Sequence, residues 1–415
     1  MTVLGQVIGI LGTIAAVVSL VLAKWPHRDA RHKGSVGAFV ETRQYLKAHI
    51  PQLTEKAIAE HREFIADPDL PMLTRPGWVL PEPVPLGDLV IRRDPEAGDG
   101  LERALKTVRQ YWPTQVSGLH MERYHEAVTA YDKPGNWFNG ASYRLLDVAA
   151  ADGGMELAFT DCWYWDNFDT TEVLLYEAAL EYSRSRGRTI RGRYRRYLRD
   201  PFDLTRRCTI PGIDALTIRR DGGKSTFYLH RRGSAEVASA LNTTGIVPAG
   251  EFQPSDDSIA ARAVDFDLWK SILREYAEEF LDLADARDRV GAPIDYLTEE
   301  PYAGINAARS SGAVRPYVLG IGLDPCTWKP TILTVCVFEA GVFDEIFADM
   351  ISANREGILE LPQRARSDAG TFHGWPWEEE MVAAYVRDPA VFPAARSALA
   401  LTWRFRERLG LAEPA

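Results

Sequence analysis

The pattern of hydrophobic and polar positions begins with an apolar run near the N-terminus. Residues 3–23 carry no charge and are interrupted only by Gln6, Thr13 and Ser19. About 20 apolar residues are enough to cross the hydrocarbon core of a bilayer. Four basic residues follow in segment 24–33 and none precedes the run, so the positive-inside rule predicts a single-pass helix in the inner or cell membrane and a cytoplasmic body. A cleaved signal peptide is the alternative, but it would carry its positive charge before the apolar stretch.

Small residues recur within this apolar run. Gly5 and Gly9 are four residues apart, a spacing that lets two membrane helices approach closely and form a homodimer. The alternative is that these glycines have no such role, because glycine is frequent in membrane-spanning helices.

Residues 36–204 mix helical and extended patterns. Two helices are predicted over residues 36–66, because the helical spacing is interrupted at Pro51. Six prolines between residues 68 and 85 then favour an extended segment. The other predicted elements are helices over 101–111 and 171–182 and a hairpin with strands over 143–150 and 155–165.

Short strands and longer helices dominate after residue 204. Strands are predicted over 214–220, 225–232, 235–240, 245–252, 315–323 and 331–340, and helices over 268–287, 342–350, 378–386 and 393–409. These changes divide the chain into a transmembrane helix (1–23), a basic juxtamembrane linker (24–35), a helical and proline-rich region with a hairpin (36–204) and a mixed α/β domain (205–412).

The composition argues against several classes of function and site. The net charge is −10 at pH 7, which argues against a generic nucleic-acid coat, and we expect no specific nucleic-acid partner. The four cysteines are scattered and lack CxxC spacing, so neither a zinc site nor a disulfide framework is predicted.

A basic segment interrupts this acidic chain. Eight arginines lie between residues 184 and 199. They are typical of an anion-binding patch for a phosphorylated ligand, for RNA or for the acidic inner leaflet of a membrane. The alternative is a solvated linker whose charge offsets the acidic remainder of the chain.

The strongest candidate chemistry lies on the helix predicted over 268–287. Glu275, Glu278 and Glu279 are spaced i, i+3 and i+4, so their carboxylates share one side of the helix and repel one another. A divalent cation with hard oxygen ligands, Mg²⁺ or Mn²⁺, would convert this repulsion into binding. The alternative is an ordinary acidic surface, since glutamate is a good helix former.

The same helix resembles a known motif. Residues 274–279 (REYAEE) match the REUxEE core of the Nudix box, and residues 246–250 (IVPAG) resemble the strand and glycine that open it. The chain is therefore similar to the Nudix hydrolase superfamily over about residues 213–409. This resemblance implies an α/β/α sandwich with a mixed sheet, here preceded by the transmembrane helix and the helical and extended N-terminal region.

The sequence departs from the family pattern in three ways. The segment from Gly250 to Arg274 is longer than in the family, Phe266 occupies the position of the first glutamate of the box, and Leu281 replaces the glycine expected after the paired glutamates. These departures bear on catalysis more than on fold.

The resemblance also implies the roles of individual residues. Glu275, Glu278 and Glu279 would ligate Mg²⁺ (or Mn²⁺), Arg274 would orient these carboxylates, and the Gly250 carbonyl would lie nearby. The implied partner is a nucleotide-derived small molecule, and the implied reaction is hydrolysis of a nucleoside-diphosphate-linked compound.

Two further residues are candidates for contact with the ligand's phosphates. His230 and Arg231 lie together at the end of a predicted strand and could face a phosphate group, although His230 fits equally well as an ordinary strand histidine. The alternative function is a catalytically inactive sensor of a nucleotide ligand at the membrane, which by analogy would suit bacterial signalling or defence.

Overall fold

A computed structural model describes residues 36–97, 100–116, 119–135, 137–151, 154–222, 224–233, 243–283, 294–354, 357–362, 367 and 370–412. Its central element is a seven-stranded mixed sheet in the order β1-β12-β13-β7-β8-β15, with β11 also paired to β7. Its strands are β1 (Val79–Pro85), β7 (Gly212–Arg220), β8 (Thr226–Phe227), β11 (Ala249–Glu251), β12 (Val314–Leu323), β13 (Pro330–Glu339) and β15 (Trp375–Pro376).

Pairing in this sheet is antiparallel except between β7 and β13, which run parallel with Gly212 opposite Thr331. Side chains alternate between the two faces of these strands. Ile213 of β7 and Ile332 of β13 belong to one hydrophobic core together with α10 (Leu268–Leu281). Leu216 and Leu333, in the same two strands, belong to a second core with α14 (Pro393–Arg404).

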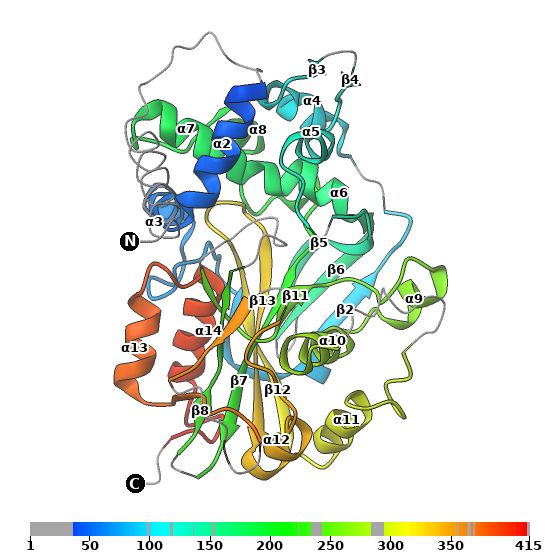
Figure 1. Cartoon of the computed structure of the whole chain (residues 1–415), viewed down its shortest axis with the longest axis vertical. Helices are drawn as coiled ribbons and strands as arrows, with labels where there is room; N and C mark the ends of the chain where they lie inside the picture. Colours follow the sequence, from blue (N-terminus) through cyan, green and yellow to red (C-terminus); the bar gives the residue numbers. More distant parts are fainter. Residues whose placement is uncertain are drawn as a thin grey trace, which may run out of the picture.

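Helices cover both faces of the large sheet (Figure 1). Helix α10 lies on one side, and α13 (Glu379–Arg387) and α14 lie on the other. Three shorter helices complete this part of the chain: α9 (Ile259–Val264), α11 (Tyr302–Ser310) and α12 (Ala340–Ile346). A small antiparallel sheet in the order β10-β9-β14 adjoins it, built from β9 (Leu229–Arg232), β10 (Thr244–Ile246) and β14 (Gly357–Glu360).

The residues before 205 form helices and a second three-stranded sheet. The sheet has the order β2-β6-β5, from β2 (Val90–Arg93), β5 (Ala141–Ala151) and β6 (Gly154–Trp163), and a short hairpin joins β3 (Gln115–Val116) to β4 (Leu119–His120). The helices are α2 (Val36–Ala48), α3 (Ile50–Glu60), α4 (Glu102–Val108), α5 (Tyr124–Tyr131), α6 (Tyr164–Asn167), the π-helix η5 (Phe168–Glu172), α7 (Val173–Ser185) and α8 (Arg193–Leu198). Short 3-10 turns occur at η2 (Arg62–Phe64), η3 (Leu86–Asp88), η4 (Arg109–Tyr111) and η6 (Leu204–Arg206).

Helix α10 begins and ends at residues whose chemistry explains its bounds. The Asp267 carboxylate accepts hydrogen bonds from the N–H groups of Trp269 and Lys270, which caps the N-terminus. At the other end Asp282 adopts a left-handed conformation, and the Leu283 N–H donates to the Ala277 carbonyl. This bond closes the last turn, so the helix ends before residue 287, where the sequence predicts its end.

The fold class predicted from the sequence is wrong. The prediction is an α/β/α sandwich that follows a transmembrane helix, whereas the described residues form a mixed α/β structure with one seven-stranded and two three-stranded sheets. Within the described ranges, no helix is long and apolar enough to cross a membrane. The predicted span 3–23, with Gly5 and Gly9, and the linker 24–35 lie outside the described residues. The extra sheet arises because the 141–163 hairpin pairs with β2, a partner that local patterns do not specify.

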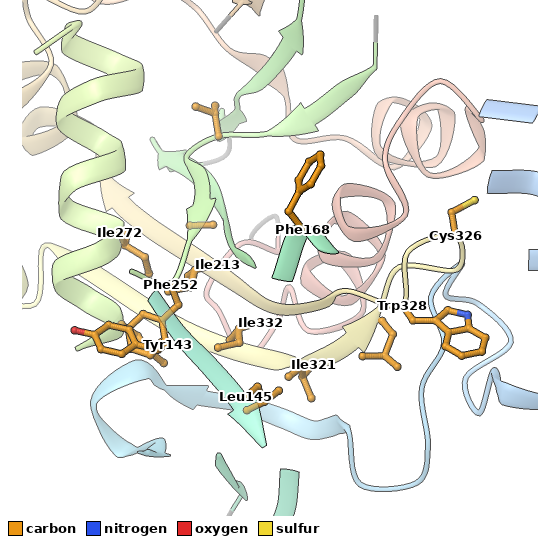
Figure 2. Close-up of a cluster of buried hydrophobic side chains, with 14 of the residues drawn as sticks. Tyr143, Leu145, Phe168, Ile213, Phe252, Ile272, Ile321, Cys326, Trp328 and Ile332 are labelled. Atoms are coloured by element: carbon orange, nitrogen blue, oxygen red, sulfur yellow. The ribbon is translucent and has the colours of Figure 1, made fainter. Parts of the chain in front are cut away.

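Both the large sheet and the hydrophobic core cross residue 204, where the sequence predicts a domain boundary. Strand β1, from the proline-rich segment, pairs antiparallel with β12. Figure 2 shows Tyr143 and Leu145 of β5 beside Ile213, Phe252 and Ile332. The two predicted regions therefore share one core.

Candidate functional site

Gly250 and Glu275 bring the strand and the helix of the predicted motif into contact. Gly250 is the central residue of β11 and lies opposite Ile213 of β7. The Glu275 carboxylate reaches from α10 to this residue, and a Cβ placed on Gly250 would collide with it. Glycine is therefore required here because only a residue without a side chain lets the carboxylate lie against the strand.

The other two predicted carboxylates lie along the same helix. Glu279 is buried, and its Oε2 accepts a hydrogen bond of 3.2 Å from the Ala249 N–H. Glu275 and Glu278 are half-buried. Because Glu275 and Glu279 are four residues apart, they share a face of α10, and both reach β11. The structure thus places an acidic helix face directly on the strand that carries Gly250.

Arg274 binds residues on both sides of α10 in the sequence, Gln253 before it and Tyr296 after it. Its guanidinium donates to the Tyr296 hydroxyl at 2.5 Å and to the Gln253 carbonyl at 2.6 Å, and lies 3.8 Å from an Asp265 oxygen. Asp265 is adjacent to Phe266, which occupies the position of the missing first glutamate, and also accepts a hydrogen bond from the Ser255 N–H. Arg274 therefore fixes the lengthened segment between β11 and α10.

The two predicted phosphate contacts are placed apart from this helix. His230 is buried between β10 and β14, and burial, followed by the nearby Arg232 charge, lowers its pKa to about 4. Arg231 is exposed and pairs with Glu360 at 2.6 Å. The next residue, Arg232, reaches β11, since its guanidinium donates to the Ala249 carbonyl at 3.3 Å.

A charged cluster that the sequence does not reveal includes Glu251, the residue after Gly250. Lys329 Nζ lies 2.5 Å from an oxygen of Glu251 and 3.8 Å from one of Glu172, which ends the π-helix η5. Burial raises the pKa of Glu172. Burial also raises the pKa of Asp214 to about 6, against the opposing effect of the Arg232 and Lys329 charges.

These cluster residues are far apart in sequence, which is why spacing could not group them. The available signal was Glu251 itself, a carboxylate next to the motif glycine. Perturbed pKa values of buried groups are common at functional sites, but structural ion pairs produce them too. We call these five residues the Lys329 cluster: Glu172, Asp214, Arg232, Glu251 and Lys329. The cluster adjoins the candidate site and has a structural role, because Lys329, just before β13, joins η5 to β11.

The carboxylates of α10 are the residues that the sequence predicts as cation ligands. Proteins commonly hold Mg²⁺ through one or two carboxylates together with the phosphates of a bound compound. Glu275 and Glu278 are half-buried and three residues apart, and Glu279 accepts a hydrogen bond from the Ala249 N–H. Across the described part of the chain, no three or more His, Cys, Asp or Glu side chains are grouped so as to hold a metal ion. A cation held by α10 would therefore need most of its ligands from a bound phosphate compound and water.

Comparison with models of protein families and with curated proteins gives no match for this chain.

Proposed function

We propose that the site between α10 and β11 binds a nucleoside-diphosphate-linked compound together with Mg²⁺. The observation that carries the proposal is the contact between Glu275 and Gly250. Gly250 and Arg274, which mark the two halves of the Nudix-like motif, are 24 positions apart in the sequence. Strand β11 and helix α10 nevertheless lie against each other, and Glu275 and Glu279 of α10 contact β11.

Each residue of the site has a defined task in this proposal. Glu275 and Glu278 would hold the cation, which when bound neutralises phosphate oxygens and polarises the phosphorus centre. Glu279 holds the backbone of β11 through the Ala249 N–H. Arg274 holds α10 to the preceding segment through Gln253 and to the following segment through Tyr296.

The bound compound is either cleaved or sensed. Cleavage needs a residue that activates water, and the α10 motif alone does not supply one. The engagement of Glu279 by Ala249 and of Arg274 by the preceding segment favours a sensor that keeps its ligand intact. Both forms share the same binding site.

The test is a titration of the whole chain with a panel of nucleoside-diphosphate-linked compounds, with and without Mg²⁺, followed by product analysis. We expect Mg²⁺-dependent binding that weakens at least about tenfold when Glu275→Gln is combined with Glu278→Gln, because the cation loses its protein ligands. Turnover of the bound compound would identify a hydrolase, and binding without turnover a sensor.

A matched control removes two carboxylates elsewhere. Glu379 and Glu380 are exposed in the first turn of α13, across the large sheet from α10. Changing both to glutamine removes the same charge and should leave the affinity unchanged. Mg²⁺-independent binding, equal losses in both variants, or no binding by any member of the panel would refute the proposal.

A further inference from the structure

The arginine segment 184–199 separates into a buried residue and an exposed surface. Arg195 is buried and pairs with the buried Glu177 at 3.0 Å. Five other arginines are exposed and make no ion pair with any carboxylate in the part of the chain that the structure describes. They are Arg186, Arg188, Arg193, Arg196 and Arg199. We refer to these five residues as the arginine surface.

Three acidic residues near the arginine surface are already paired with other arginines, and a fourth, Asp200, is exposed beside Arg199 and has no ion pair among the described residues. Glu181 lies 3.7 Å from Arg184, and Glu63 lies 2.9 Å from Arg191. Asp203 lies 2.8 Å from Arg206. Five positive charges within 14 positions therefore remain uncompensated by these neighbours, on a chain whose overall charge is −10.

Two of these arginines occupy backbone positions that usually favour glycine. Arg186, the C-cap of α7, has φ 58°, and Arg199, the C-cap of α8, has φ 65°. A left-handed conformation costs a non-glycine residue about 1 kcal/mol or more. The chain thus carries an arginine at two turns where glycine, which has no Cβ, would be less strained.

The arginine surface lies where the chain enters the described fold. Figure 1 places α2, α7 and α8 together at one end of the molecule, and α2 begins at Val36. The sequence immediately before α2 is also basic, with Lys24, Arg28, Arg31 and Lys33. Clusters of this kind are attracted to anionic lipid headgroups.

Aromatic side chains at this surface argue against a single-stranded nucleic acid. Binding of unpaired bases relies on exposed aromatic faces. Tyr194 is fully buried, and Tyr197 is half-buried and stacks on it with ring centroids 6.1 Å apart. Guanidinium groups without an accessible stacking partner match phosphate headgroups better than bases.

We propose that the arginine surface on the α7–α8 connection and α8 binds anionic phospholipid headgroups and orients this end of the molecule toward a membrane surface. The test measures partition of the full chain onto phosphatidylcholine vesicles with and without phosphatidylserine. The variant combines Arg193→Gln, Arg196→Gln and Arg199→Gln. Each basic residue near an anionic surface contributes about fivefold to partition at low salt, so we expect a loss of about 100-fold on phosphatidylserine vesicles.

The control variant removes the same charge from a different surface. Lys224, Arg387 and Arg408 are exposed, and they belong to the β7–β8 turn, the end of α13 and the segment after α14, away from α7 and α8 (Figure 1). Changing these three to glutamine should reduce partition far less, and added salt should reduce wild-type binding toward the level of the variant. Thermal melts of both variants should match the wild type, because no substituted side chain is buried.

Three results would overturn the proposal. One is equal partition onto vesicles with and without phosphatidylserine, since any contribution from the apolar residues 3–23 is common to both. Another is an equal loss in the two variants, which would indicate a general charge effect. The third is tight binding of a single-stranded RNA oligomer, lost in the Arg193, Arg196 and Arg199 variant, without a preference for anionic vesicles.

Discussion

Position 250 requires glycine because of a neighbouring side chain on α10, not because of its own backbone conformation. The space that a Cβ would need is filled by the Glu275 carboxylate. The two residues therefore act as a pair, and the effect of changing one depends on the other.

Gly250→Ala should lower the free energy of unfolding by about 1–3 kcal/mol, because the added methyl group displaces a half-buried side chain. Combining it with Glu275→Ala should recover most of this loss. Gly245→Ala is the control, since its Cβ would meet only Phe392 at an ordinary 3.8 Å. Urea denaturation of the wild type, Gly250→Ala, Glu275→Ala, the double variant and Gly245→Ala measures the coupling. Purely additive losses would contradict the described contact.

Asp214 makes stability depend on pH in a direction set by its raised pKa. Burial raises that pKa to about 6, against about 3.9 in an unfolded chain. The folded state therefore holds the proton more tightly, and the favourable contribution is complete below pH 4 and is lost as the pH rises through 6.

Asp214→Asn should accordingly stabilise the protein by about 2 kcal/mol at pH 7.5 and have little effect near pH 4. Denaturant melts across this pH range provide the measurement. Asp88→Asn, at an exposed position, should show no comparable change. A constant difference between wild type and Asp214→Asn at all pH values would refute the titration of this group.

At the scale of elements, α8 is fixed to α7 by one buried ion pair. Glu177 accepts hydrogen bonds from the Arg195 side chain and from the Tyr194 and Arg195 N–H groups. Gly192 leaves room for it, because a Cβ there would collide with the Glu177 carboxylate. This contact explains why an arginine-rich segment folds as part of the core.

Arg195→Gln should lower the free energy of unfolding by about 3–5 kcal/mol, because it leaves Glu177 buried without its counter-charge. Arg196→Gln, one position later and exposed, should change stability by less than about 0.5 kcal/mol. Chemical denaturation of both variants tests the distinction. Similar losses in the two variants would show that the buried Arg195 does not stabilise the fold more than the exposed Arg196.

The sequence predicts those elements whose signals are local. The strands at 315–323 and 331–340 correspond to β12 and β13, and the hairpin corresponds to β5 and β6. The start of α10 follows from Asp267, but its end depends on the left-handed conformation of Asp282, which spacing does not reveal. The π-helix before α7 is likewise absent from the helical pattern.

The residues of the candidate site also fall into two groups, those that the sequence predicts and those that only the structure brings there. Gly250 and the glutamates are found from the motif because a helix fixes the relative positions of residues three and four apart. Lys329 and Arg232 approach β11 from other parts of the fold. Their roles depend on tertiary contacts between residues far apart in sequence, and a single sequence carries no signal for such contacts.

At the scale of the whole molecule, the region before residue 205 completes the large sheet. Gly320 of β12 lies so close to β1 that a Cβ would be 2.6 Å from the Trp78 carbonyl. Without β1, the outer edge of β12 would expose unpaired backbone groups.

Residues 205–415 produced alone should therefore fail to show a cooperative melt and should aggregate, because they lack an edge strand and part of the shared core. Circular dichroism melts and size-exclusion chromatography of this fragment and the full chain make the comparison. A monomeric fragment that melts cooperatively near the temperature of the full chain would instead support an independent domain at the predicted boundary.

The pairing of β1 with β12 also has a consequence during synthesis. Strand β12 begins about 230 residues after β1 ends. At about 5–20 residues per second, a ribosome needs roughly 10–50 s to cover that distance. Throughout this interval β1 has been made while its partner has not, so the proline-rich composition of β1, which weakens pairing between identical chains, protects the nascent chain until the sheet can close.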